Sequence, residues 1–313
     1  MLSRSADHLY WMARYMERAE NTARILEISQ RMALLPHVAK VGASEWRAVL
    51  EIAGDSADFA ARYGEASPAE IVSYMTLDPL NPSSVYAAIR SARQNARAER
   101  VSITSEMWES LNATWIEVRE LTPAKLARRG YRDFFDWIKE RSHLFRGITM
   151  GTMLRDETYD FIRLGTFIER DDDIARILDV KYHVLLPAHQ EVGGAVDHFQ
   201  WGALLRSVSA FRAYHKVYHD KITPWRVAEL LVLNASMPRS LHACHDNISE
   251  IIERISGPRT TEAGRLAGEI HASLHYGTIE EITKLGLHEF LTQFIARNNA
   301  LSTEIRNSYL VSA

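Results

Sequence analysis

One short motif appears twice in this chain, at an interval close to half its length. The segment 16–26 recurs as 168–178 with identical residues at six of eleven positions, and Glu17-Arg18 becomes Glu169-Arg170. The interval between the two copies, 152 residues, is too long for a solenoid of small helical units. It favours a chain built from two related halves.

A second match supports this interpretation. Residues 82–87 resemble 238–243 at an interval of 156 residues, and both segments precede an expected helix. We therefore expect two tandem helical halves, residues 1–150 and 151–313, forming one compact duplicated bundle about a pseudo-two-fold axis.

The hydrophobic periodicity predicts an all-α protein. In the first helix, apolar or small residues recur three and four positions apart, at Leu9, Met12, Met16, Ala19, Ala23 and Leu26. This spacing is typical of a helix that buries one face. The chain lacks sustained alternation of polar and apolar residues. It has only 15 Gly and 9 Pro, so few turns and long helices are expected.

Helix boundaries are marked by local signals. Ser67-Pro68-Ala69-Glu70 and Thr278-Ile279-Glu280-Glu281 have the pattern of capping boxes, and we expect the second to begin the long last helix. Thr122-Pro123 is expected to end a helix that begins near Ser102. Residues 184–194, with Pro187 and two glycines, are the clearest predicted loop.

The repeated polar residues share one face of their helices. Glu17, Asn21 and Arg24 are three and four residues apart, so they form a stripe beside the apolar one. Glu169, Asp173 and Arg176 form the corresponding stripe in the second half. Arg18 points about 100° away from Glu17, so each of these two charges is expected to pair with another helix.

Composition excludes several classes of protein. The formal net charge is −3, which gives no general basic surface for nucleic acid. No stretch reaches the roughly 18 apolar residues of a membrane-spanning helix, and the start of the chain has no signal-peptide pattern. Cys244 is a single cysteine, which we expect to be a small core residue. We expect a cytoplasmic protein without a membrane or nucleic-acid partner.

The Glu-Arg motifs admit two interpretations. In the first, Arg14, Arg18 and Arg170 line a polar cleft and bind a carboxylate or phosphate, while Glu17 or Glu169 binds an amine or acts as a base. In the second, the same charges form an ion-pair network that holds helices in register.

The turn at residues 81–84 is a second candidate. Ser83, Ser84 and Ser240 each precede a helix, where backbone N–H groups can hold an anion. The alternative is simple helix capping. We expect Asn81, Ser83 and Ser84 to close the Glu-Arg cleft.

Other constellations give weaker signals. His215/His219 and His271/His275 have the spacing of two metal ligands on one helix, but 13 histidines produce such pairs by chance. Consecutive residues of the segment 171–173 diverge by about 100°, so its three aspartates cannot bind one ion together. We therefore expect no metal and no cofactor. The sequence contains no nucleophile motif and no nucleotide-binding loop.

The opening of the chain resembles a known family. The pattern Ser-Arg-x-Ala-x-x-Leu-Tyr-Trp-Met-x-Arg-Tyr-Met-Glu-Arg-Ala-Glu at 3–20 is similar to the Alpha-E family of bacterial helical domains with a Glu-Arg motif. Residues 81–85, 151–156 and 165–172 resemble further motifs of that family. Met237-Pro238-Arg239-Ser240 departs from the first copy, so a site formed by both halves need not be symmetric.

The resemblance implies partners rather than a chemistry. Alpha-E proteins are encoded beside a circularly permuted ATP-grasp ligase and a transglutaminase-like protein, which implies a system that forms or modifies peptides. We expect a non-catalytic helical partner of the ligase that binds a carboxylate- or phosphate-bearing substrate, or a partner protein. The alternative is a helical enzyme that uses Glu17 and Glu169 for acid–base chemistry. The sequence leaves the substrate and the oligomeric state open.

Overall fold

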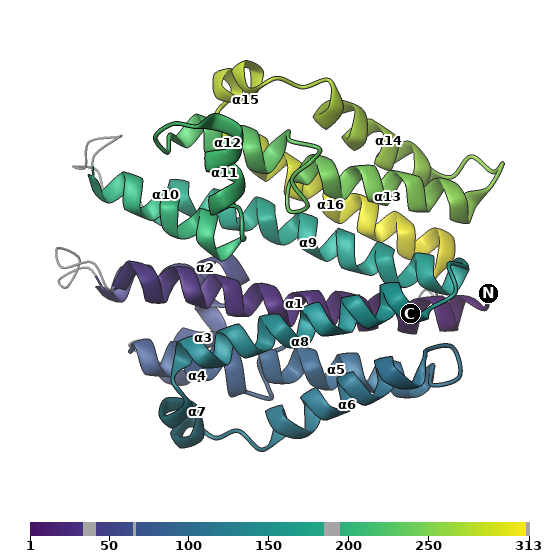
Figure 1. Cartoon of the computed structure of the whole chain (residues 1–313), viewed down its shortest axis with the longest axis horizontal. Coiled ribbons are helices and arrows are strands. Elements are labelled where there is room, and N and C mark those ends of the chain that lie inside the picture. The colour runs from purple at the N-terminus through teal and green to yellow at the C-terminus, as the bar shows by residue number, and fades with distance from the viewer. Residues whose placement is uncertain (34–41, 65–66, 185–194, 311–313) are drawn as a thin grey trace. The chain divides into compact units, whose positions relative to one another are not determined.

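Every regular element in the described part of the chain is a helix. A computed structural model describes residues 1–33, 42–64, 67–184 and 195–310, and within these it contains sixteen α-helices and no strand (Figure 1). The all-α prediction is therefore confirmed. None of the described helices is both long enough and apolar enough to cross a membrane.

The sixteen helices are numbered in chain order. Their bounds are α1 (Ser3–Ala33), α2 (Gly42–Ala53), α3 (Ser56–Tyr63), α4 (Pro68–Leu77), α5 (Val85–Ala98), α6 (Ser105–Arg119), α7 (Pro123–Arg129), α8 (Tyr131–Thr152), α9 (Glu157–Val184), α10 (Ala195–Ser207), α11 (Phe211–Tyr218), α12 (Pro224–Val232), α13 (Leu241–Ser256), α14 (Glu262–His275), α15 (Ile279–Leu285) and α16 (Leu287–Tyr309).

Side-chain caps fix most helix starts where the sequence places them. Ser67 forms a complete capping box with Glu70, and Ser84 accepts from the Ala87 N–H at the start of α5. These hydroxyls satisfy N–H groups that have no partner inside the helix. The first apolar stripe is also confirmed, because its six residues from Leu9 to Leu26 are all buried.

Two boundaries differ from the sequence prediction. Thr278 does form a capping box, but it begins the seven-residue α15 and not the last helix. Gly286 ends α15 with φ 102°, where any Cβ would also collide with the Glu289 carboxylate. Likewise, Thr122-Pro123 caps and begins α7, a short helix that the sequence analysis missed. The predicted loop at residues 184–194 lies outside the described residues from position 185 onward.

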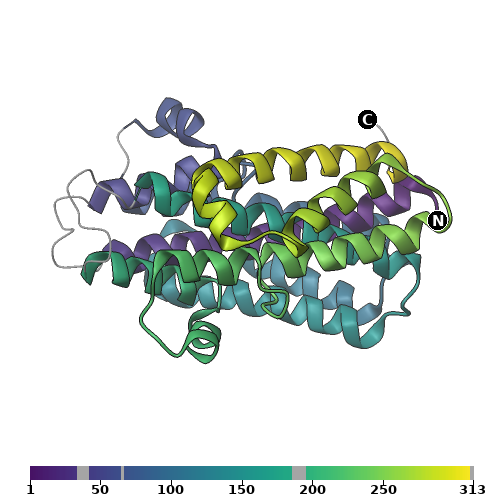
Figure 2. The same ribbon diagram turned by 90° about the horizontal axis from the view of Figure 1, so that it is seen from above.

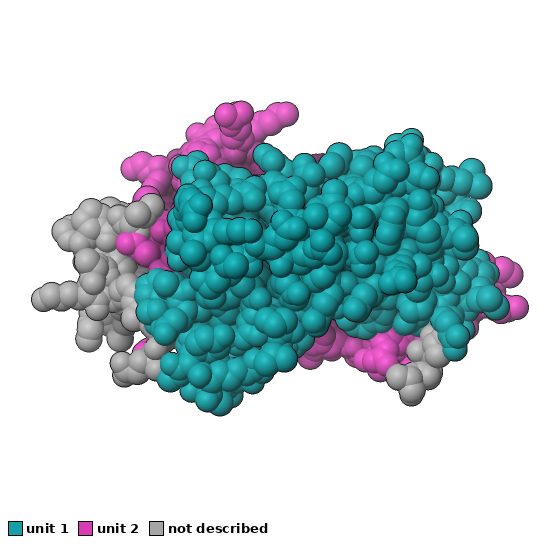
Figure 3. Space-filling model, turned by 90° about the horizontal axis from the view of Figure 1, so that it is seen from below, with its two compact units in different colours: residues 1–27, 49–169, 309–313 teal, residues 28–48, 170–308 magenta. Residues whose placement is uncertain are grey.

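The chain divides into two compact units, coloured separately in Figure 3. Unit 1 comprises residues 1–27, 49–169 and the C-terminal residues from Tyr309. In it, α5 packs on α6, and α6 packs on α8. Its core includes the buried side chains of Met12, Ile89, Met107, Phe134 and Phe145.

Unit 2 comprises residues 28–48 and 170–308. Its most extensive helix pair is α13 and α14, which lie side by side along their length in both views (Figures 1 and 2). The two helices form a hairpin around the turn at Gly257. Ile248, Ile252, Ala267 and Ile270 are buried in this unit.

Helices α9 to α16 repeat the order and approximate lengths of α1 to α8. The turns before α5 and α13 also have the same hydrogen bonds. Ser84 caps α5 and donates to the Asp78 carbonyl at 2.7 Å, and Ser240 caps α13 and donates to the Asn234 carbonyl at 2.7 Å. The sequence match between these two segments therefore reflects a shared local structure.

Candidate functional site

A close approach between α1 and α9 brings the first charged residues together. Gly165 on α9 faces the backbone of Tyr10 on α1, where any Cβ would collide with the Tyr10 carbonyl. One turn further along each helix are Arg14 and Glu169. Because residues four apart lie on one helix face, the glycine contact aligns these two side chains.

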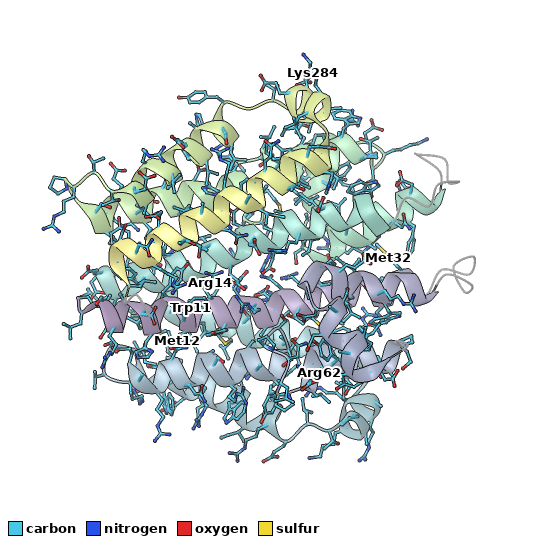
Figure 4. The ribbon with its side chains drawn as sticks, turned by 180° about the vertical axis from the view of Figure 1, so that it is seen from behind. Trp11, Met12, Arg14, Met32, Arg62 and Lys284 are labelled. Atoms are coloured by element: carbon cyan, nitrogen blue, oxygen red, sulfur yellow. The ribbon has the colours of Figure 1, made fainter. Side chains whose placement is uncertain are left out.

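Glu169 is held by two arginines of α1. Its carboxylate accepts from Arg14 Nε at 2.7 Å and from Arg18 through Nε at 2.5 Å and Nη2 at 3.1 Å. Arg14 also stacks on Trp11, with 4.7 Å between the guanidinium carbon and the ring centroid; Figure 4 labels both residues. The prediction that Arg18 pairs with a carboxylate outside its own turn is confirmed.

This pairing determines the charge of Glu169. Burial opposes ionisation of its carboxylate, but the Arg18 and Arg14 guanidiniums outweigh it and lower its pKa to about 2 from 4.5. Glu169 is therefore an ion at neutral pH, with both carboxylate oxygens bonded to arginine.

Arg146 on α8 is the centre of a second cluster. Its Nη1 donates to Glu17 at 2.6 Å, to Glu20 at 2.5 Å and to the Ser142 hydroxyl at 2.8 Å. Glu17 and Arg18 thus pair with different helices, as their angular separation predicts. The repeated motif uses its two charges in two separate contacts.

The cluster continues towards the C-terminal end of α1. Arg24 donates to Glu20 at 2.6 Å, and Lys139 donates to Glu27 at 2.7 Å. His143 Nε2 lies 3.4 Å from a Glu20 oxygen. We call these residues of α1, α8 and α9 the Glu-Arg cluster: Arg14, Glu17, Arg18, Glu20, Arg24, Glu27, Lys139, His143, Arg146 and Glu169.

Carboxylates and cations differ in exposure within the Glu-Arg cluster. The side chains of Glu17, Glu20 and Glu169 are 1%, 0% and 6% exposed. Those of Arg18 and Arg146 are 28% and 22% exposed, and that of His143 is 54% exposed. The carboxylates are therefore inside, and the Arg18 and Arg146 guanidiniums and the His143 ring form the outer edge, whereas Arg24 is only 2% exposed.

The turn at residues 81–84 meets α1 through Thr22, whose hydroxyl donates to the Ser83 carbonyl at 3.3 Å. Asn81 is fully buried and serves its own turn, accepting from the Ser83 N–H at 2.8 Å. Ser84 is the N-cap of α5. Ser84 is thus a helix cap, as the capping interpretation predicts, whereas Asn81 and Ser83 bond to each other within the turn.

The remaining predicted residues lie on α9. Arg170 is buried and Asp173 is half-buried. Asp172 pairs with Arg176 at 2.6 Å, which corresponds to the pair of Glu20 and Arg24 in the first copy. This shared pairing extends the likeness of the two copies to their ion pairs.

Asp171 and His245 form a second buried pair, in unit 2. Both side chains are fully buried, and Asp171 Oδ2 lies 2.6 Å from His245 Nε2. Burial raises the pKa of Asp171 to about 6 from 3.8, although His245 opposes the increase. Its neighbour Asp172 meets an arginine instead, Arg176.

The raised pKa of Asp171 predicts a pH dependence of stability. The folded state holds this proton more tightly than the unfolded chain, so the stabilising contribution is complete below about pH 4 and is lost as the pH rises through 6. We expect Asp171→Asn to flatten this decline between pH 4 and 7. The melting temperatures of variant and wild type, compared across this pH range, measure the effect. Asp172→Asn is the control. Parallel curves for wild type and Asp171→Asn would contradict the assignment.

The α8 half of the Glu-Arg cluster is not among the residues predicted from the sequence. Lys139, His143 and Arg146 are four and three residues apart and therefore share one helix face. This basic stripe was a readable signal, but α8 lies outside the repeated motif. The corresponding residues of α16, 156 positions later, are Ile295, Asn299 and Ser302, so the second copy lacks the stripe.

The geometry defines a helical domain organised around a Glu-Arg motif and its ion pairs. The chain belongs to the Alpha-E family, described as a predicted alpha-helical domain with a conserved ER motif, whose sequence profile matches residues 1–310. The Glu-Arg pairs at 17–18 and 169–170 both contribute to the buried charges described above.

Mycobacterial proteins are among the relatives. An uncharacterized protein of Mycobacterium bovis is 25% identical over 309 residues, which cover 92% of this chain and 34% of the relative. Two uncharacterized proteins of Mycobacterium tuberculosis strains are 25% and 24% identical over the same share. The chain thus spans about a third of the length of the curated relatives it matches. No solved structure matches it.

Proposed function

We propose that this protein is a non-catalytic helical partner of an ATP-grasp ligase that forms peptide or amide bonds. In this proposal, the outer edge of the Glu-Arg cluster binds a carboxylate- or phosphate-bearing substrate, or an acidic segment of a partner protein. A transglutaminase-like protein is the second partner implied by the family resemblance.

The observation that carries the proposal is the exposure of the cations above buried carboxylates. Arg146 bonds Glu17, Glu20 and Ser142 through Nη1, so among the described residues its Nε and Nη2 have no bonded partner. Arg18 is likewise 28% exposed while it holds Glu169. Guanidinium groups fixed by buried carboxylates are preorganised donors for an incoming carboxylate or phosphate.

The relatives support a role beside another protein module. They are about three times as long as this chain, so a region similar to it occurs within a larger polypeptide. In those relatives the similar region is covalently linked to further sequence. We infer that in this protein the helical domain acts together with a separate catalytic protein.

The acid–base alternative has less support. A general base works best when its pKa lies near the operating pH, whereas the pKa of Glu169 is lowered to about 2. Glu17 is 1% exposed and bonded to Arg146. These properties suit structural ions better than groups that exchange protons with a substrate.

The direct test is an assay of the neighbouring ligase with and without this protein. We expect the two proteins to co-purify and the ligase rate on its amine and carboxylate substrates to rise when the helical protein is present. An unchanged rate together with no association would overturn the proposal.

Glu17→Gln tests whether the Glu-Arg cluster carries this role. The substitution keeps the shape of the side chain, and Arg146 retains Glu20 and Ser142 as partners, so we expect the fold to persist. Without the charge on Glu17, Arg146 loses one of the two carboxylates that hold it in place. We expect the increase in ligase rate caused by this protein to fall at least tenfold. Glu109→Gln, at an exposed position of α6, is the matched control. Full activity in Glu17→Gln would leave the cluster a purely structural network.

We also infer that α1–α8 and α9–α16 are two copies of one eight-helix unit. The matched turns before α5 and α13, and the matched pairs of Arg24 with Glu20 and Arg176 with Asp172, support this. The boundary at residue 150 and the pseudo-two-fold axis stay predictions, which superposition of an experimental structure on itself can test.

A further inference from the structure

Three histidines of unit 2 come together at one end of the α13–α14 hairpin. His242 lies in the first turn of α13, and His271 and His275 occupy the last turn and a half of α14. One ligand atom from each lies within 4.8 Å of the other two. The sequence shows the spacing of His271 and His275 but does not indicate that His242 joins them.

His242 is oriented like a metal ligand. Its Nδ1 lies 2.8 Å from the Leu233 carbonyl, which can only accept, so Nδ1 carries the proton and Nε2 presents a lone pair when the ring is neutral. A ligating imidazole characteristically donates its other N–H to a backbone carbonyl in this way.

The Nε2 atom of His242 is buried and has no hydrogen-bond partner among the described residues. The whole residue is 6% exposed, so solvent does not satisfy this nitrogen. Asp246 Oδ1 lies 3.4 Å from it and 2.8 Å from His271 Nε2. A lone pair and a carboxylate oxygen facing each other at this distance repel unless a cation lies between or beside them.

The corresponding hairpin of the first half, α5–α6, has no histidine at the equivalent positions. The residues 156 positions before His242 and His271 are Tyr86 and Trp115, whose rings stack edge to face at 5.2 Å. Arg90 occupies the place of Asp246 and lies over the Tyr86 ring. An aromatic and cationic contact in α5–α6 is thus replaced in α13–α14 by three imidazoles and a carboxylate.

From these observations we propose that His242, His271 and His275 bind a divalent transition metal ion of the zinc class, with Asp246 supplying negative charge beside them. Imidazole nitrogen suits such ions. Two ligands of a tetrahedral zinc ion are ~3.4 Å apart, so small rotations of His271 and the exposed His275 close the set. Three protein ligands leave one coordination position for water or a substrate atom.

The proposal is tested by titrating the full chain, free of any polyhistidine tag and treated with chelator, with zinc chloride in a calorimeter. We expect one ion per chain with micromolar or tighter affinity, and visible absorption of a tetrahedral site when cobalt(II) replaces zinc. Zinc should also raise the melting temperature, because it binds only the folded hairpin. No binding at one equivalent would overturn the proposal.

Variants separate this site from adventitious binding. His275→Ala changes an exposed residue and is expected to keep the fold while weakening zinc binding at least tenfold. His242→Tyr installs the residue of the first copy and is expected to abolish one-equivalent binding. Asp246→Asn is expected to weaken binding ~10–100-fold. The control is His215→Ala/His219→Asn, which removes a pair of the same sequence spacing whose second member ends α11 in a left-handed conformation. Equal losses in the control and in His275→Ala would overturn the assignment.

Discussion

His245→Ile is expected to lower the free energy of unfolding by about 3–5 kcal/mol at pH 7. The substitution leaves the Asp171 carboxylate in a fully buried position without the imidazole that lies 2.6 Å from it. A buried charge that loses its partner must either remain uncompensated or take up a proton, and both cost free energy. Urea denaturation followed by circular dichroism measures the difference.

The first copy of the repeat supplies the control. At the positions of Asp171 and His245, 152 and 156 residues earlier, it has Ala19 and Ile89, both buried. The double variant Asp171→Ala/His245→Ile installs this apolar pair, and we expect it to recover the stability lost in the single variant. A well-packed apolar pair often equals or exceeds a buried ion pair. A double variant as unstable as His245→Ile alone would contradict the role assigned to the pair.

Arg146→Met is the second substitution with a large expected effect. It removes the α8 cation bonded to both Glu17 and Glu20, whose side chains are 1% and 0% exposed. We expect a loss of about 3–5 kcal/mol in the free energy of unfolding, measured in urea. Arg146→Lys should recover part of it, because an ammonium ion keeps the charge but not the planar geometry.

Two controls accompany Arg146→Met. Arg129→Met removes a half-buried residue whose guanidinium stacks on Trp137 at 4.8 Å, and it should cost no more than ~1 kcal/mol. Glu17→Gln in the Arg146→Met background removes one of the stranded charges and should restore stability. Additive losses in that double variant would show that the two residues do not interact.

Local signals in the sequence predicted most helix starts. Caps such as Ser67 and Ser84 accept from backbone N–H groups three residues away. The capping residue and the helix start that it stabilises therefore lie in one short segment of sequence. Helix ends that depend on one glycine were harder. Gly286 separates α15 from α16 because of its positive φ, and nothing in the preceding capping box indicates where that helix stops.

The candidate site was predictable only in part. The repeat indicated Glu17, Arg18 and Glu169, but the partner Arg146 is 129 residues from Glu17, and nothing local encodes that pairing. The polar stripe was also expected at the edge of the buried surface. Instead Glu17 and Arg24 are 1% and 2% exposed, because the basic stripe of α8 covers their face of α1. Burial of a charge becomes favourable when another helix supplies the counter-charge.

The contact between Gly165 and Tyr10 has a consequence for how such sequences can change over time. A side chain at position 165 would push the two backbones apart, and Glu169, one turn further on, would lose its reach to Arg14. We therefore expect substitutions at Gly165, Glu169 and Arg14 to be coupled, so that a change at one requires compensation at the others. Replacing one hydrogen of Gly165 with a methyl group is therefore expected to break the contact of Glu169 with Arg14, although both charges are retained.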